Sequence, residues 1–135
     1  MNEYEEIRTE IDNYLMEQFK YRRPLLYLTP DNIIVCRRTS RVDLYLRIRR
    51  KESLFPPDYL IIARVSFKNE RVGHGSHFVR FLVETALKYG FKHIGIKSTN
   101  EKSSAFARKL GFYSIDGSSY AISVENLICY FQNKI

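Results

Sequence analysis

The sequence has 135 residues, with 22 Lys and Arg against 15 Asp and Glu, a formal net charge of +7, and 44% hydrophobic residues. This length and apolar content predict one folded domain, and no stretch reaches the roughly 18 consecutive apolar residues of a membrane-spanning helix. The acidic, polar beginning does not resemble a secretory signal, and two cysteines are too few for a disulfide framework or a zinc site, so we expect a cytoplasmic protein without a metal.

The first part of the chain predicts a helix followed by a β-meander. Hydrophobic residues recur every three or four positions between residues 3 and 20, which is typical of an amphipathic helix. Beyond Pro24, short apolar runs separated by turn residues predict antiparallel strands at 25–28, 32–38 and 41–50. In the last of these strands apolar and polar residues alternate, so one of its faces is expected to be buried.

The second part predicts alternating strands and helices. A β-rich run at 59–67 leads through a polar, glycine-containing loop to a helix at 76–89 and a strand at 92–97. Two strands joined through a helix in this way form a parallel pair with a right-handed crossover. The remaining elements are expected as a helix at 103–110 and as extended segments at 112–115, 119–123 and 127–131. The whole pattern predicts a mixed α/β fold.

Most of the positive charge is concentrated in one segment. Residues 37–51 contain seven basic residues and one acidic residue, a net charge of +6, whereas the remaining 120 residues carry a net charge of +1. One interpretation is a solvated strand whose arginines protect a sheet edge. The alternative is a binding surface for an anionic partner, which could be nucleic acid, an acidic protein or a phosphorylated ligand. The candidate partner-binding residues are Arg37, Arg38, Arg41, Arg47, Arg49 and Arg50.

Two glycines precede the helix predicted at 76–89. Gly73 and Gly75 allow successive backbone N–H groups to point at one anion, and the helix dipole favours a phosphate at the same place. The dinucleotide-binding pattern G-x-G-x-x-G fails because its third glycine would be Phe78, and the Gly-Lys-Ser/Thr of a P-loop is missing. Taken alone, the loop indicates an anion site without defining the anion.

Two linked motifs make the sequence resemble the GNAT superfamily of acyl-CoA-dependent N-acetyltransferases. In that family a strand valine precedes the loop R/Q-x-x-G-x-G/A, which opens a helix. Here Val65 lies eight residues before Gly73, and residues 70–75 read ERVGHG. Downstream, the family has an asparagine and a helix that ends K-x-G-F, and this sequence matches the spacing with Asn100, Lys109, Gly111 and Phe112. The resemblance covers residues 59–131, whereas residues 1–58 hold the leading helix and the basic meander.

The resemblance implies a GNAT-like fold for the single domain 1–135: a mixed, mostly antiparallel sheet with a splayed central parallel pair, flanked by helices. It also implies that residues 59–135 bind acetyl-CoA or a related acyl-CoA. The pyrophosphate would lie on the backbone of residues 71–76, and the pantetheine would pair with the 59–67 strand as an extra strand. By the resemblance, the cofactor-binding residues are Val65, Phe67, Arg71, Val72, Gly73, His74, Gly75, Ser76, Asn100, Ser103 and Phe106.

The sequence departs from the family pattern where acid and base chemistry is expected. Glu70 replaces the usual Arg or Gln of the loop, and Ala107 stands where many members carry the tyrosine that protonates the departing thiolate. Weak candidates for the missing catalytic roles are Tyr59, Ser66 and Tyr113, each of which is also explained as an ordinary packing residue.

Two functions follow as hypotheses. The first is an N-acetyltransferase that moves an acetyl group from acetyl-CoA to an unidentified amine, which could belong to an acidic protein or to a nucleic-acid-associated substrate. The second is a weak or inactive GNAT-like domain that binds nucleic acid or an acidic protein through the basic hairpin 37–51. A homodimer is compatible with both. Of the two thiols, Cys129 is expected to be buried, and no motif marks Cys36 as a nucleophile.

Overall fold

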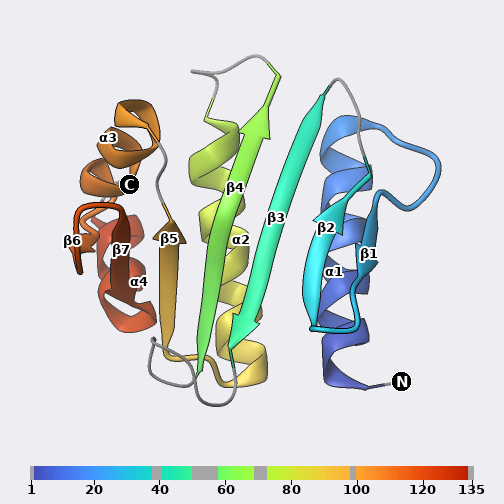
Figure 1. Cartoon of the computed structure of the whole chain (residues 1–135), viewed down its shortest axis with the longest axis horizontal. Coiled ribbons are helices and arrows are strands. Elements are labelled where there is room, and N and C mark those ends of the chain that lie inside the picture. Colours follow the sequence, from blue (N-terminus) through green and yellow to red (C-terminus); the bar gives the residue numbers. More distant parts are fainter. Residues whose placement is uncertain (1, 38–40, 50–57, 69–72, 98–99, 134–135) are drawn as a thin grey trace.

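The computed structural model describes residues 2–37, 41–49, 58–68, 73–97 and 100–133, and Figure 1 shows how its helices and strands are arranged. In chain order they are α1 (Glu3–Phe19), β1 (Leu26–Leu28), β2 (Ile33–Cys36), β3 (Val42–Arg49), β4 (Tyr59–Phe67), α2 (His74–Tyr89), β5 (His93–Lys97), α3 (Glu101–Lys109), β6 (Tyr113–Ser114), β7 (Ser119–Ser123) and α4 (Val124–Gln132). Among the described residues, no helix has the length and hydrophobicity that a membrane span requires.

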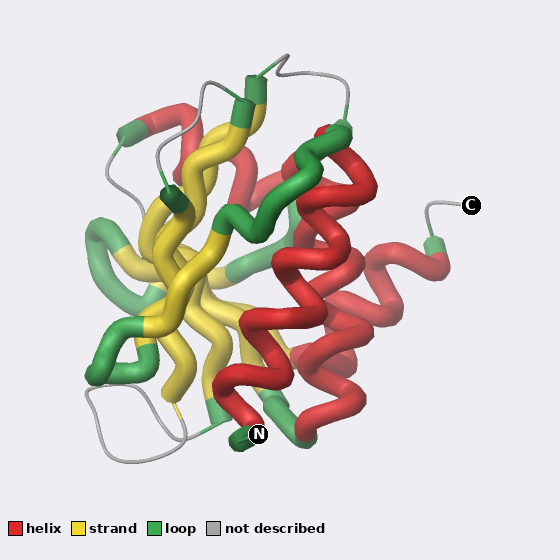
Figure 2. The backbone as a smooth tube through the Cα atoms, turned by 90° about the vertical axis from the view of Figure 1, so that its right-hand side faces the viewer, coloured by secondary structure: helices red, strands yellow, loops and turns green. Residues whose placement is uncertain are grey.

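The strands form one seven-stranded sheet in the order β1-β2-β3-β4-β5-β7-β6. Neighbouring strands are antiparallel except β4 and β5, which are parallel and are connected through α2. The helices α1, α2 and α4 lie side by side on one face of the sheet (Figure 2). None of the described helices lies across β1–β4 on the opposite face, which we call the outer face (Figure 1). The predicted mixed sheet with one central parallel pair is therefore confirmed.

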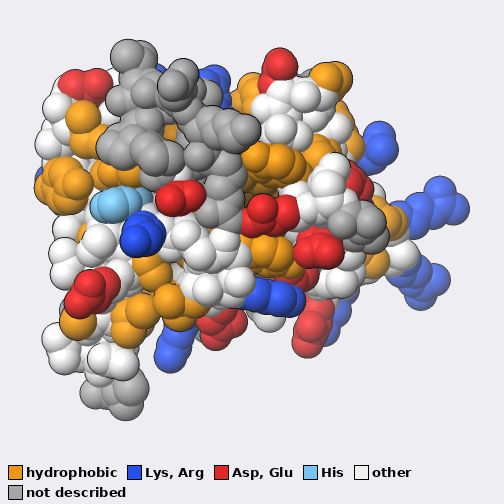
Figure 3. Space-filling view, turned by 90° about the horizontal axis from the view of Figure 1, so that it is seen from below, with side chains coloured by type: hydrophobic (Ala, Val, Ile, Leu, Met, Phe, Trp, Pro, Cys, Tyr) orange, Lys and Arg blue, Asp and Glu red, His pale blue; other side chains and the backbone are white. Residues whose placement is uncertain are grey.

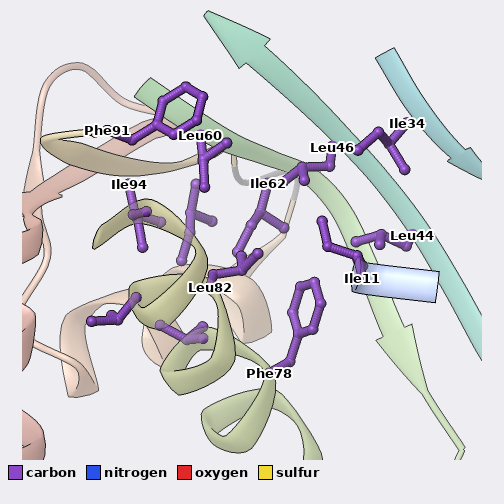
Figure 4. Close-up of a cluster of buried hydrophobic side chains, with 14 of the residues drawn as sticks. Ile11, Ile34, Leu44, Leu46, Leu60, Ile62, Phe78, Leu82, Phe91 and Ile94 are labelled. Carbon is purple, nitrogen blue, oxygen red and sulfur yellow. The ribbon is translucent and has the colours of Figure 1, made fainter. Parts of the chain in front are cut away.

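The core lies between the sheet and the helices because alternate residues of the central strands are apolar. The inward side chains of β2–β5 meet side chains of α1 and α2, and those that are 0–1% exposed include Ile34, Leu44, Leu46, Leu60, Ile62, Ile94, Ile11, Phe78 and Leu82 (Figure 4). Burial of each such side chain contributes about 1.5–3 kcal/mol. This period-two pattern fixes which face of each strand turns toward the helices.

A buried carboxylate ties α1 to the meander. The side chain of Asp12 is 2% exposed, and its Oδ1 accepts hydrogen bonds from the backbone N–H groups of Leu25 at 2.7 Å and Leu26 at 3.3 Å. Arg8, one turn earlier on α1, donates from Nη1 to the other carboxylate oxygen at 2.9 Å. A carboxylate is buried without a large penalty only when it is paired and hydrogen-bonded in this way.

The C-terminal segment corrects one prediction. The strand expected at 127–131 is wrong, because this segment belongs to α4. Ser123 is the N-cap of that helix, and its Oγ accepts a hydrogen bond from the N–H of Asn126 at 3.1 Å. Short apolar runs do not distinguish a strand from a helix by periodicity, and the cap is the signal that decides between them.

The helical conformation also changes the environment of one thiol. On α4, Val124 and Leu127 are buried, whereas Cys129 lies on the exposed side, so the expectation of a buried Cys129 is wrong. Cys36, the last residue of β2, is buried.

Candidate functional site

A β-bulge interrupts β4 close to its middle. The register with β3 shifts between Leu46 and Tyr45, whose partners on β4 are Ile62 and Arg64. Ala63 is therefore one extra residue in β4. A bulge of this kind bends the strand and turns its backbone N–H and C=O groups away from the regular ladder.

The parallel pairing of β4 with β5 ends at the same place. The last pair joins Ile62 and Ile96, immediately before the bulge, and β4 continues to Phe67 (Figure 1). Over Ala63–Phe67 no described strand pairs with the β5 side of β4. Backbone groups on that side are placed to pair with a ligand that binds as an extra strand.

Three predicted site residues lie on this segment of β4. Phe67 is 8% exposed, and with Val65 it belongs to the core on the helix side of the sheet. Ser66 lies between them and is exposed on the outer face. Only the backbone of Val65 and Phe67 is therefore placed for the contacts that the resemblance implies.

The N-terminus of α2 has no side-chain cap among the described residues. Gly73 is its N-cap and has φ +87°, a left-handed conformation that glycine adopts without strain. Within the described part of the chain, no side chain accepts a hydrogen bond from the first turn, and that turn holds no acidic residue. In contrast, α1, α3 and α4 are capped by the side chains of Asn2, Asn100 and Ser123, respectively. The first N–H groups of α2 and its dipole therefore favour an anion here.

The second motif lies against this turn. The Phe106 ring of α3 packs on Gly75, so that a Cβ at residue 75 would come within 3.1 Å of Phe106 Cζ. Asn100 caps α3, because its Oδ1 accepts a hydrogen bond from the N–H of Ser103 at 2.9 Å. The structure thus brings Phe106 to the glycine turn, while Asn100 and Ser103 bond to each other at the start of α3.

Aromatic side chains fix the start of α2 to its surroundings. The ring of His74 lies 4.8 Å from that of Phe19, at the end of α1, and 6.0 Å from that of Phe67, at the end of β4. Phe19 and Phe67 stack on each other at 5.4 Å. These contacts hold the glycine turn at the carboxyl end of β4, on the side of the bulge where β4 no longer pairs with β5.

Two of the candidate acid–base residues lie elsewhere. Tyr59 begins β4, four residues before Ala63, which corresponds to about 13 Å along the strand. Its ring stacks on His93 at 4.6 Å, and Tyr113 lies near its hydroxyl. Burial, followed by the neighbouring Tyr113, raises the pKa of Tyr59. Tyr59 and Tyr113 therefore form a pair at the amino end of β4, away from the glycine turn.

Residue 107, where many GNAT sequences have a tyrosine, is buried in this protein. Ala107 is 0% exposed and belongs to the core beneath α3. A larger side chain at residue 107 would have to displace its neighbours, because protein cores are close-packed.

Several residues that the sequence singled out lie outside the described part of the chain, namely Arg38, Arg50, Glu70, Arg71 and Val72. Of Arg49, only the backbone is described. Of the other arginines, Arg41 donates from Nη1 to the carbonyl of Phe19 at 2.8 Å and thereby caps α1. Arg37 and Arg47 lie on the outer face of the meander.

The sequence did not predict the Ala63 bulge. The residues around it, Ile-Ile-Ala-Arg-Val, contain no glycine or other signal for a bulge.

No family model and no curated protein matches this sequence, but solved structures match its fold. The complex of KacTA with DNA has a TM-score of 0.57 at 14% identity, over 92% of this chain and 86% of that chain. AtaTR bound with acetyl-CoA has a TM-score of 0.55 at 16% identity, over 86% and 78% of the two chains. A tyrosine-to-phenylalanine mutant of the AtaT toxin, bound to the C-terminus of the antitoxin AtaR and acetyl-CoA, has a TM-score of 0.55 at 16% identity, over 73% and 70%. These neighbours have the GNAT fold, and the mixed sheet of this chain with its one parallel pair matches that fold.

Proposed function

We propose that this protein is an acyl-CoA-dependent N-acetyltransferase that transfers an acetyl group from acetyl-CoA to an amine. The observation that carries the proposal is the separation of β4 from β5 at Ala63, at the same end of the sheet as the uncapped start of α2. Beyond Ala63, β4 leaves backbone groups that can pair with an extended chain of amides, and the start of α2 favours an anion. A molecule with a pyrophosphate at one end and two amides along its length suits both.

The residues present fit such a ligand. The backbone N–H groups of residues 73–76 would hold the pyrophosphate, helped by the dipole of α2. Glycine at residue 75 leaves no side chain between this turn and Phe106, whose ring would form one wall of the pantetheine site. The backbone of Val65 and Phe67 would pair with the pantetheine amides. Arg71 and Val72 complete the proposed set but lie outside the described residues.

Bound acetyl-CoA would supply a thioester whose acetyl group is open to attack by a neutral amine. The backbone around Ala63, which the bulge turns away from the ladder, would donate an N–H to the carbonyl oxygen as negative charge develops on it. A new C–N bond forms, the C–S bond breaks, and the sulfur departs with the electron pair. The proton lost by the amine would pass to water, since Tyr59 and Tyr113 lie at the other end of β4. The departing sulfur would take its proton from water as well, because Ala107 has no acidic group.

This arrangement predicts binding of acetyl-CoA together with slow transfer. General acid catalysis contributes about 10²–10⁴-fold where a positioned side chain supplies it. Because Ala107 occupies the position of the usual acid, we expect the leaving sulfur to take its proton from solvent. We also expect transfer to be slower than in relatives that retain a tyrosine.

Calorimetry with acetyl-CoA tests the site. Ser76→Glu places a carboxylate in the first turn of α2, beside the proposed pyrophosphate, and should abolish binding. Asn13→Glu makes the same change of charge on an exposed position of α1 and should leave binding intact. Unchanged binding by the Ser76 variant would refute the pyrophosphate site. No saturable binding by the wild-type protein at millimolar acetyl-CoA would refute the proposed function.

Transfer is tested separately by mass spectrometry. A panel of small amines and basic peptides is incubated with acetyl-CoA and the protein, and acetylated product is measured against the Ser76→Glu variant. Product that depends on the wild-type protein is the expected result. If acetyl-CoA binds but no acceptor is acetylated, the proposal of acetyl transfer is contradicted and only the binding of acetyl-CoA is supported.

A further inference from the structure

A row of side chains crosses four strands on the outer face of the sheet. In the register of the meander, Tyr27 pairs with Val35, Val35 with Tyr45, and Tyr45 with Arg64. Cross-strand partners point to the same side of a sheet. Since the neighbours of Tyr45 in β3, Leu44 and Leu46, are buried under the helices, the row points outward. We call Tyr27, Val35, Tyr45 and Arg64 the aromatic–arginine row.

We propose that the aromatic–arginine row is a docking surface for single-stranded nucleic acid. Guanidinium groups flank both of its rings: Arg37 lies 5.4 Å from the ring of Tyr27, and Arg47 and Arg64 lie 5.7 and 5.5 Å from the ring of Tyr45. Tyrosine rings and guanidinium planes are the two kinds of side chain on which unpaired bases stack. The same guanidinium groups neutralise phosphates.

The guanidinium of Arg47 has one donor without an acceptor among the described residues. Its Nε is buried and forms no hydrogen bond within that part of the chain. An unsatisfied buried donor costs about 1–3 kcal/mol, and a phosphate oxygen of a bound strand would offset this cost once the guanidinium turned outward. Arg64, in contrast, forms an ion pair with Asp43, with Nε 2.5 Å from Oδ2. The charge available to a strand therefore comes mainly from Arg37 and Arg47.

The dimensions and the charge around the row fit the same partner. Four adjacent strands span about 14 Å, and a four-stranded sheet with exposed aromatic rings holds two or three stacked bases in the RNA-recognition motif. Exposed Lys20, Arg22 and Arg23 precede β1. Seen from below, Lys and Arg side chains project at the right-hand edge of the molecule (Figure 3). Acidic residues instead mark the start of α1, in the first turn of that helix.

The two tyrosine rings of the row favour a nucleic acid over an acidic protein as its binding partner. An acidic peptide would pair with the arginines but would gain nothing from tyrosine rings. Tyr27 is 41% exposed, so its ring is accessible to a stacked base. The charge of segment 37–51 thus acts together with rings that the charge pattern did not reveal. This inference is independent of the proposed acetyl transfer, since acetyl-CoA binding and strand binding are measured in separate assays.

Fluorescence anisotropy with a labelled, mixed-sequence RNA of about 12 nucleotides tests the proposal on the full chain. Tyr27→Leu with Tyr45→Leu removes the rings but keeps apolar strand residues, and should weaken binding at least about tenfold. Tyr27→Phe with Tyr45→Phe keeps the rings and should bind like the wild type. If the leucine pair fails to fold, shown by its circular dichroism, single Tyr27→Leu, at the exposed position, serves instead.

Charge is tested with a matched pair of variants. Arg37→Gln with Arg47→Gln should reduce the slope of log affinity against log salt by about 1.4, which corresponds to two phosphates. Arg80→Gln with Lys109→Gln removes the same charge from exposed helix positions and should keep the wild-type slope. Wild-type affinity in the leucine variants, or equal losses in the two charge pairs, would overturn the proposal. Displacement of the RNA by polyglutamate at equal charge would also overturn it, in favour of an acidic protein.

Discussion

The ring of Phe106 lies against the backbone of Gly75, and a Cβ at residue 75 would meet Phe106 Cζ at 3.1 Å and Cε1 at 3.2 Å. This contact joins the two motifs that lie far apart in the sequence, the glycine turn before α2 and the helix after Asn100. Gly75 lies within α2 and is not in the left-handed region, so glycine is required here by the neighbouring ring and not by the backbone.

We therefore expect Gly75→Ala to destabilise the protein although alanine is the better helix former by about 1 kcal/mol. The loss arises because the Phe106 ring must move. In a Phe106→Leu background the same change should become neutral or stabilising, by up to about 1 kcal/mol. Urea unfolding of the four proteins measures the coupling between the two sites. Equal effects of Gly75→Ala in both backgrounds would show that the ring does not restrict residue 75.

Asp12 should be among the residues on which stability depends most. Asp12→Ala leaves the backbone N–H groups of Leu25 and Leu26 without this acceptor and removes the buried carboxylate that pairs with Arg8. Removing one member of a buried charged network costs about 3–5 kcal/mol. Chemical denaturation measures the loss, and Glu5→Ala is the control, because it removes only the more exposed partner of Arg8. A loss of stability no larger for Asp12→Ala than for Glu5→Ala would contradict this account.

A second contact between helices should depend on pH. Lys88 of α2 donates to Glu10 of α1 at 2.7 Å, and the hydroxyl of Tyr89 donates to the other oxygen of the same carboxylate. Burial alone would raise the pKa of Glu10, but the hydrogen bonds from Lys88 and Tyr89 outweigh it and hold the pKa below the usual 4.5. A carboxylate with a lowered folded-state pKa contributes stability above its unfolded pKa and loses it as the pH falls through the folded value.

Glu10→Gln should therefore lower the melting temperature at pH 7, and the difference from the wild type should shrink as the pH falls below about 4.5. Calorimetric melting of both proteins, at pH 7 and at a series of lower pH values, measures this difference in melting temperature. Glu17→Gln, at an exposed position of the same helix, is the matched control and should not show this convergence. A difference that stays constant with pH would mean that the charge of Glu10 does not stabilise the contact.

The sequence predicts those parts of the fold in which local pattern and burial agree. Alternation in β3 and the three-to-four spacing in α1 give these elements within a residue or two of their bounds, because each buries a single face. The Ala63 bulge could not be predicted, because it is a property of the register between β3 and β4 and leaves no mark on residue type. The aromatic–arginine row was hidden for the same reason. Tyr27, Tyr45 and Arg64 become neighbours only through the register of four strands.

The two thiols should report on the helical conformation of α4, which local pattern did not reveal. Cys129 lies on an exposed helix position, whereas burial raises the pKa of Cys36 to about 11. At pH 8 only roughly one Cys36 thiol in a thousand would be ionised, and its sulfur also donates to the carbonyl of Arg37 at 3.2 Å. With Ellman's reagent we therefore expect one thiol to react rapidly in the native protein and the second only after unfolding in urea. Cys129→Ser should remove the rapid phase and leave the slow one. A rapid phase that persists in this variant would place Cys36 at the surface and contradict its position at the end of β2 beneath α1.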